Sequence, residues 1–171
     1  MNDRIDEVLE QYGDMVYKVA LARTRKKEDA EDVYQDVFVK YMMNSKPFES
    51  EEHRKAWLLR VTINCSNTLL TSAWRRRVCT MDDLSRLTDG ALGGIETKLE
   101  NETYLAVLNL PVKYRDVIHL FYYEQMPVLW IAQVLGCKED TVKSLLFRGR
   151  RLLEKELKKS EDADNSGKGR G

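Results

Sequence analysis

The chain of 171 residues contains little proline, glycine or cysteine. With 3 prolines and 9 glycines it is not a collagenous or low-complexity chain. The cysteines (Cys65, Cys79 and Cys137) are odd in number and form no CxxC pair, so we expect neither a disulfide framework nor a cysteine zinc site. No apolar run approaches the roughly 20 residues of a spanning helix, and the first residues lack the pattern of a signal peptide. We therefore expect a cytoplasmic protein that does not itself insert into a membrane.

The chain also has no net charge, because 28 Lys and Arg balance 28 Asp and Glu. This balance excludes coating of nucleic acid by bulk positive charge. The charges are nevertheless segregated: no acidic residue occurs from Arg54 to Met81 or from Thr141 to Leu153, and an acidic segment lies between these stretches. Two basic stretches joined by an acidic connector indicate two surfaces for polyanions, although two solvated helix faces would give the same pattern.

Apolar residues recur at helical spacing through most of the chain, and strand patterns are absent. We predict helices at residues 5–26, 29–43, 51–74, 97–108, 111–121, 127–135 and 141–158. Residues 78–96 lose this periodicity, which indicates a linker. The predicted fold class is all-α, with two small helical domains at 1–77 and 97–159, an acidic flexible linker at 78–96 and a disordered tail at 160–171.

A run of small or polar residues, from Asn64 to Thr68, interrupts the apolar pattern of the third predicted helix. Such side chains compete with the backbone for hydrogen bonds and are poor in helix interiors. We therefore predict a local break there, before the helix resumes at Leu69.

Residues 131–144 have the spacing of a helix-turn-helix. Ala132 is small where two helices cross, Gly136 permits the turn, and Val142 buries against the first helix. On the second helix, Val142 shares the inner stripe with Leu146 and Leu153. The opposite side is free to enter a major groove of DNA and carries Lys143, Ser144, Phe147, Arg148 and Arg151. An ordinary helical hairpin with a basic outer face is the alternative.

Motifs in the first half resemble those of bacterial sigma factors. Residues 29–38 (DAEDVYQDVF) resemble the signature D-A-E-D-x-x-Q-[DE]-x-F, and residues 56–64 (AWLLRVTIN) resemble A-W-L-x-x-I-x-x-N. From Leu110-Pro111 onward, the second half resembles sigma region 4. With regions 2 and 4 and a short linker between them, the chain resembles an extracytoplasmic-function (ECF) sigma factor. The resemblance implies a protein that binds core RNA polymerase and directs promoter-specific transcription initiation, without enzymatic activity, cofactor or metal.

The resemblance also implies roles for individual residues. It assigns Asp32, Gln35 and Asp36 to docking on the clamp helices of core polymerase, whose flap is a further expected contact. It assigns capture of a base flipped from the minus-ten element to Asn64, Asn67 and Thr68, and grip of backbone phosphates to Arg75, Arg76 and Arg77. It adds Thr141 to the residues that read the minus-thirty-five element. From the residues alone, a solvated acidic face and caps of a broken helix remain the alternatives.

The chain departs from the family pattern in region 4. Leu129 and Trp130 stand where two acidic residues are usual, Lys138 stands where a serine cap is usual, and Leu145 replaces a common basic residue. One hypothesis is that Leu129 and Trp130 contact an anti-sigma factor, which could hold the protein at a membrane, or a polymerase element. The other is that they pack into the region 4 core.

The alternative function is a stand-alone helix-turn-helix regulator that binds operators without polymerase. Such proteins usually dimerise on palindromes, and no dimerisation heptads are present. An enzyme is the least supported class, because His53 and His119 are isolated from the cysteines and neither a glycine-rich phosphate loop nor HExxH occurs.

Overall fold

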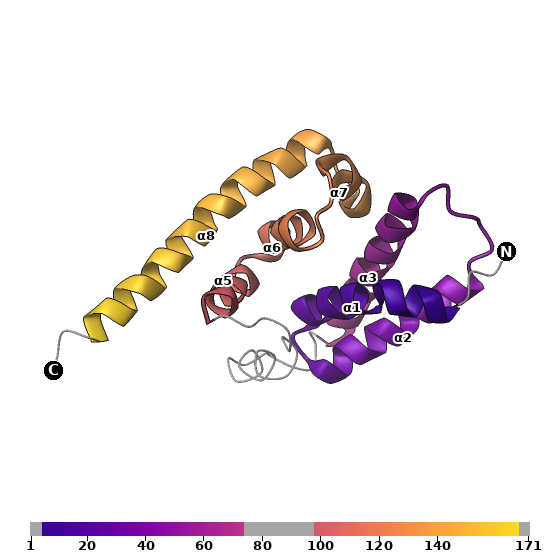
Figure 1. The fold of residues 1–171 in the computed structure, drawn as a ribbon, viewed down its shortest axis with the longest axis horizontal. Coiled ribbons are helices and arrows are strands. Elements are labelled where there is room, and N and C mark those ends of the chain that lie inside the picture. The colour runs from indigo at the N-terminus through magenta and orange to yellow at the C-terminus, as the bar shows by residue number, and fades with distance from the viewer. Residues whose placement is uncertain (1–4, 74–97, 168–171) are drawn as a thin grey trace. The chain divides into compact units, whose positions relative to one another are not determined.

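The computed structural model describes residues 5–73 and 98–167, and within these ranges it is helical with short connections (Figure 1). The chain divides into two compact units, one containing the helices within residues 5–73 and the other most of the helices within residues 98–167. The all-α prediction with two helical domains is therefore confirmed. The predicted linker at 78–96 lies outside the described residues.

In the first unit, α1 (Ile5–Thr24), α2 (Lys27–Met43) and α3 (Glu51–Ala73) pack against one another. Their buried faces supply a shared apolar core that includes Val16, Ala20, Val33, Val37, Leu58 and Leu59. The Tyr12 hydroxyl donates a hydrogen bond of 2.5 Å to Glu51, which joins α1 to the start of α3. Burial, together with Glu51, raises the pKa of Tyr12 above its ordinary value, so Tyr12 stays a neutral donor.

A serine caps the start of α3. The Ser50 hydroxyl accepts a hydrogen bond of 3.1 Å from the His53 amide, in the manner of an N-cap residue. Trp57, one turn later, packs edge-on against the rings of Tyr41 and Phe48, with centroids 6.0 and 5.6 Å away. Trp57 is thus part of the packing between α2 and α3.

In the second unit, α5 (Lys98–Leu108) and α6 (Val112–Ile118) are followed by a π-helical turn, η1 (His119–Tyr123). The single helix predicted at 111–121 therefore changes its hydrogen-bonding pattern near its end. The guanidinium of Arg115, which is buried, donates to the Leu108 carbonyl at 3.1 Å and ties α6 to the end of α5. Both helices pack against α8 (Glu139–Gly167).

α8 approaches α6 closely at a glycine. A Cβ atom on Gly149 would lie 3.2 Å from Cγ1 of Ile118, which is tighter than ordinary van der Waals contact. Gly149 is accordingly buried, on the same face as Val142 and Leu146, whereas Leu153 is only half-buried. The predicted inner stripe is therefore correct for its first two members, and it continues through Gly149, which has no side chain.

The helix-turn-helix is present as predicted. α7 (Val128–Leu135) ends at Gly136, whose φ of 67° lies in the left-handed region. The amides of Gly136 and Cys137 both donate to the Ala132 carbonyl and so satisfy the end of α7. α8 then starts with a hydrogen bond of 3.1 Å from the Val142 amide to the Lys138 carbonyl.

The C-terminal segment differs from the prediction of a disordered tail, because α8 continues to Gly167. Residues 160–167 are all exposed, so packing does not stabilise this part of the helix. Local hydrogen bonds accompany it instead: the hydroxyls of Ser160 and Ser166 donate to the carbonyls of Leu157 and Ala163 at 2.8 and 3.0 Å.

Gly136 provides a direct test of the turn. Replacement by alanine should lower the free energy of unfolding by about 1 kcal/mol, because a Cβ atom disfavours left-handed backbone. A Cβ atom there would meet no other atom within 4 Å, so the cost is purely conformational. Gly136→Asn should cost less, since asparagine tolerates this conformation better. Urea unfolding of the three proteins measures the difference, and equal stability of the alanine variant would contradict this conformation of the turn.

Candidate nucleic-acid interface

The outer face of α3 is polar, exposed and free of acidic groups beyond its first turn. Asn64, Asn67 and Thr68, which the sequence predicts as base-capturing residues, all lie on this face and are exposed. Arg60 and Thr71 are exposed one turn to either side and extend the same face, because residues three, four and seven apart share one side of a helix. These two residues were not predicted, although their spacing could have revealed them. We call these five residues the α3 face.

The break predicted at Asn64–Thr68 is wrong, because α3 runs without interruption from Glu51 to Ala73. Its hydroxyl side chains donate to carbonyls one turn earlier instead of competing with the helix. Thr62 bonds the Leu58 carbonyl at 2.6 Å, and Ser66 bonds the Thr62 carbonyl at 2.7 Å. Because both residues are fully buried, the small polar side chains also fit the packed face of the helix.

The α3 face is attached to α1 by a contact that the sequence does not reveal. The Arg23 guanidinium donates from Nη2 to Oδ1 of Asn67, 44 residues further along the chain. Arg23 is only 7% exposed, whereas Asn67 is exposed. The Thr68 hydroxyl donates to the Asn64 carbonyl at 3.0 Å. The predicted phosphate-binding residues Arg75, Arg76 and Arg77 lie outside the described residues.

The outer face of α8 is the second such surface. The predicted residues Thr141, Lys143, Ser144, Phe147, Arg148 and Arg151 are all exposed. The Phe147 ring is 60% exposed, and the Arg151 guanidinium carbon lies 5.7 Å from its centroid. A cation over an aromatic face is attracted by the ring, so Phe147 orients one of the basic groups. We call these six residues the α8 face.

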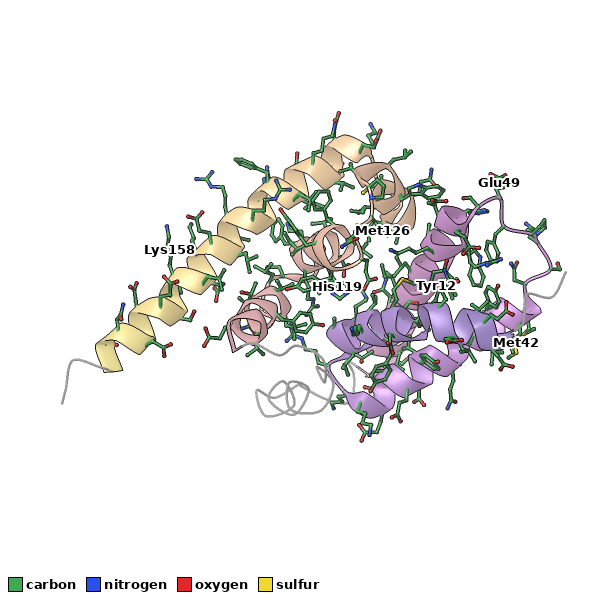
Figure 2. The ribbon with its side chains drawn as sticks, in the orientation of Figure 1. Tyr12, Met42, Glu49, His119, Met126 and Lys158 are labelled. Atoms are coloured by element: carbon green, nitrogen blue, oxygen red, sulfur yellow. The ribbon has the colours of Figure 1, made fainter. Side chains whose placement is uncertain are left out.

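A third exposed stripe runs along α2. The predicted docking residues Asp32, Gln35 and Asp36 are exposed and lie opposite the buried residues of this helix. The stripe continues through apolar side chains that were not predicted: Val39 is 47% exposed, Met42 60% and Met43 79%. Met42 is among the side chains labelled in Figure 2. The α2 stripe thus joins an acidic part to an apolar part.

Comparison with known families identifies both units. Residues 8–76 match Sigma-70 region 2, and residues 100–153 match Sigma-70, region 4. This chain belongs to the sigma-70 family. It is an ECF sigma factor, and since sigma factors are not enzymes, the prediction of a non-enzymatic protein is confirmed.

Individual relatives agree with this assignment. The chain is 26% identical over 168 residues to the ECF RNA polymerase sigma factor SigW of Bacillus subtilis, covering 91% of this chain and 90% of the relative. It is 28% identical over 155 residues to SigM of the same organism, covering 88% and 93%. The match to the family thus extends over nearly the whole chain.

Solved structures share the fold. One is CnrH in complex with the cytosolic domain of CnrY, with a TM-score of 0.62, 23% identity, and coverage of 92% of this chain and 90% of that one. Another is the sigma factor RpoE of Bartonella quintana in complex with the anti-sigma factor NepR, with a TM-score of 0.66, 21% identity, and coverage of 90% and 96%.

The residues at which this sigma factor departs from the family pattern lie on α7, on α8 and between the two helices. The Lys138 carbonyl accepts the first hydrogen bond of α8, so the absence of a serine cap does not prevent the helix from starting. Leu145 is half-buried between the inner and outer sides of α8. On α7, Leu129 is 50% exposed and Trp130 is half-buried. None of the helices in residues 5–73 and 98–167 is long and apolar enough to cross a membrane.

Arg150 is basic and exposed but packs against region 4 itself. Its Nε donates to the Tyr122 hydroxyl at 2.5 Å, and its guanidinium carbon lies 5.7 Å from the Phe121 ring centroid and 5.5 Å from that of Tyr122. These contacts fasten α8 to the π turn η1. The basic residues between Thr141 and Leu153 therefore divide into an outward group on the α8 face and this packing residue.

The continuity of α3 is testable at an exposed position. Asn64→Pro should lower the free energy of unfolding by about 3 kcal/mol or more, because proline removes an amide donor and clashes with the carbonyl of Arg60. Asn64→Ala is the matched control and should change stability by less than about 0.5 kcal/mol. Thermal and urea unfolding compare the variants. If the proline variant is as stable as the alanine variant, the helix is broken there.

The division among the arginines of α8 gives a further prediction. Arg150→Gln should destabilise the protein by about 0.5–1 kcal/mol through loss of its aromatic contacts. Arg148→Gln, two residues away, should leave stability unchanged, since Arg148 is exposed and makes no hydrogen bond or ion pair with the described residues. Urea unfolding distinguishes the two, and Tyr122→Phe isolates the share of the hydroxyl. Equal effects of the two glutamine variants would contradict a packing role for Arg150.

Proposed function

We propose that this ECF sigma factor binds core RNA polymerase and places its two outward faces on the two elements of a promoter. The observation that carries the proposal is the pairing of an acid-free α3 face in region 2 with an acid-free α8 face in region 4. Each face combines hydrogen-bonding side chains with cations, which is the chemistry needed for base edges and phosphates. A protein that used only one DNA element would need only one of them.

In this proposal the α8 face enters the major groove of the minus-thirty-five element. Lys143, Arg148 and Arg151 are long cationic donors suited to phosphates or guanine edges, and Ser144 can donate or accept. Phe147 is the one large apolar group on the face and suits the methyl group of a thymine. Thr141 lies at the helix start, where backbone phosphates are favoured by the helix dipole.

The α3 face binds the non-template strand of the minus-ten element once it is single-stranded. Flipping a base out of the stack costs a few kcal/mol, which polar contacts to its exposed edge can offset. Asn64, Asn67 and Thr68 supply such contacts, and Arg75, Arg76 and Arg77 hold the adjoining phosphates. Melting then follows from preferential binding of the open strand, with no chemical step on this protein.

The α2 stripe is the proposed docking surface for the clamp helices of core polymerase, with Asp32, Gln35 and Asp36 as its polar contacts. Its exposed apolar end supports this role, because large apolar patches on a protein surface mark interaction sites. Region 4 would meet the flap of polymerase. The protein would act in the cytoplasm, where polymerase transcribes.

An anti-sigma factor is the proposed regulator, and it could hold the protein at the membrane. The two solved relatives described above are complexes with such partners or with a cytosolic domain of another protein. The exposed Leu129, with Trp130 beside it, is the apolar surface of α7 that such a partner would cover.

Transcription in vitro tests the proposal. Core polymerase of the source bacterium is incubated with its genomic DNA, with and without the protein, and the new RNA 5′ ends are mapped. New starts that share two spaced upstream elements are the expected result. Combined Asp32→Lys and Asp36→Lys should abolish co-elution with core polymerase, whereas Glu31→Lys, an exposed change on a neighbouring side of α2, should not.

The contribution of the α8 face can be measured separately, through promoter binding by the holoenzyme. Lys143→Ala or Arg148→Ala should each reduce the salt dependence of promoter binding by about one unit if the residue contacts a phosphate. Lys159→Ala, beyond the α8 face, is the matched control. Tight sequence-specific binding by the protein alone, without polymerase and without new starts, would contradict the sigma role and favour the stand-alone regulator.

A further inference from the structure

We propose that Arg23 fixes the side-chain amide of Asn67 with its NH2 group outward, so that Asn67 reads the minus-ten strand as a hydrogen-bond donor only. This inference rests on the proposed function, because Asn67 meets DNA only if the α3 face binds the promoter. It identifies Arg23, which does not touch DNA in this arrangement, as a positioning residue for base specificity.

The hydrogen-bonding chemistry of the two side chains supports this orientation. The Asn67 amide has one acceptor oxygen and one NH2 group with two donors, and its oxygen accepts from Nη2 of Arg23. A guanidinium has donors but no acceptor, so a flipped amide would set donors against donors. Arginine also stays charged at every physiological pH. The orientation of the amide is therefore maintained whether or not DNA is present.

The location of Arg23 makes the contact rigid. Arg23 belongs to the last turn of α1 and is 7% exposed, so its side chain is held within the region 2 packing. Asn67 is on the exposed side of α3, with its carbonyl accepting a hydrogen bond of 2.7 Å from Thr71. The buried guanidinium of Arg23 thus contacts the oxygen side of the Asn67 amide from within the protein, and the NH2 side of the amide faces the solvent.

The neighbouring readers differ from Asn67. Asn64 is exposed, and its side chain makes no hydrogen bond with the described residues, so it can rotate to donate or accept. The Thr68 hydroxyl already donates to the Asn64 carbonyl, which leaves its lone pairs as acceptors. The α3 face therefore offers one adaptable group, one donor and one acceptor, and the donor is set by Arg23.

The consequence is a preference at the nucleotide that Asn67 contacts. At purine C6 or pyrimidine C4, an outward NH2 group donates to the keto oxygen of guanine or thymine and is repelled by the amino group of adenine or cytosine. Asn67→Asp keeps an oxygen for Arg23 but turns an acceptor outward, so the preference should move toward adenine or cytosine. Arg23→Met removes the fixing donor, and the preference at that nucleotide should weaken.

Two measurements test the proposal. In the first, urea unfolding of the full chain is followed for Arg23→Met, Asn67→Ala and the double variant. The two changes should be coupled by about tenfold in the unfolding equilibrium constant, or about 1.4 kcal/mol. Lys18→Met, an exposed change on α1, should show no coupling with Asn67→Ala. Additive effects of Arg23→Met and Asn67→Ala would overturn the contact and the inference with it.

In the second measurement, holoenzyme transcribes a library of one mapped promoter with a randomised minus-ten element, and the transcripts are sequenced. Relative to the wild type, Asn67→Asp should enrich adenine or cytosine at one position by about fivefold or more, the scale of one base contact. Arg23→Met should reduce the wild-type preference at that same position, Arg23→Lys should retain it, and Lys18→Met should leave it unchanged.

The outcomes separate this inference from the proposed function. If the wild-type protein directs starts but Arg23→Met and Asn67→Asp keep its base preferences, the positioning role is wrong and the sigma role stands. If the wild-type protein directs no starts, the proposed function fails and the reading role fails with it, whereas the coupling in urea would still show that the contact exists.

Discussion

The burial of one side of α3 is the constraint on which the region 2 surface depends. Thr62 and Ser66 are fully buried, and the hydroxyl of each donates a hydrogen bond to a carbonyl of the same helix. A buried hydroxyl without a partner would be costly, so these bonds let a polar helix pack as if it were apolar. With that side fixed, the helical period leaves Asn64, Asn67 and Thr68 no direction but outward.

In region 4, too, burial of one side of a helix determines which residues are exposed, but the contacts that bury it are different. Gly149 allows α8 to approach Ile118 closely, and Val142 and Leu146 bury beside it. Arg150 adds a lateral contact to the π turn, which limits rotation of α8 about its own axis. The α8 face therefore points outward because packing of the opposite side fixes the rotation of the helix. Charge on the face is not what sets its direction.

Helical periodicity predicts most of this architecture, because an amphipathic pattern directly reflects which side of a helix is buried. It fails where local propensity and tertiary packing disagree. Asn64–Thr68 look like a break because small polar residues favour other backbone states, yet α3 continues through them, with Cys65 and Ser66 buried and the other three residues exposed. The helical segment after Ser160 and the π turn at His119–Tyr123 likewise depend on backbone bonding that residue types specify weakly.

The sequence reveals some of the candidate site residues and misses others. Lys143, Ser144 and Arg148 are recognisable because an acid-free outer stripe is a property of one continuous segment. The role of Arg23 cannot be recognised in the sequence, because its partner Asn67 is 44 residues away and only the packing of α1 on α3 brings them together. Arg150 has the same charge and exposure as these residues, and only its aromatic neighbours on η1 show that it packs against region 4.

A reader of single-stranded bases benefits from side chains that are oriented before binding. Each rotatable side chain that becomes ordered only in the complex costs about 0.5–1.5 kcal/mol of affinity. In the arrangement we propose, the Arg23 contact orders the Asn67 amide when region 2 folds, so that this ordering cost is not added to the cost of unstacking a base during promoter opening. Asn64 has no such anchor among the described residues and would be ordered by the DNA itself. Fixed and adaptable readers on one helix face would then allow strict selection at one nucleotide and tolerance at another.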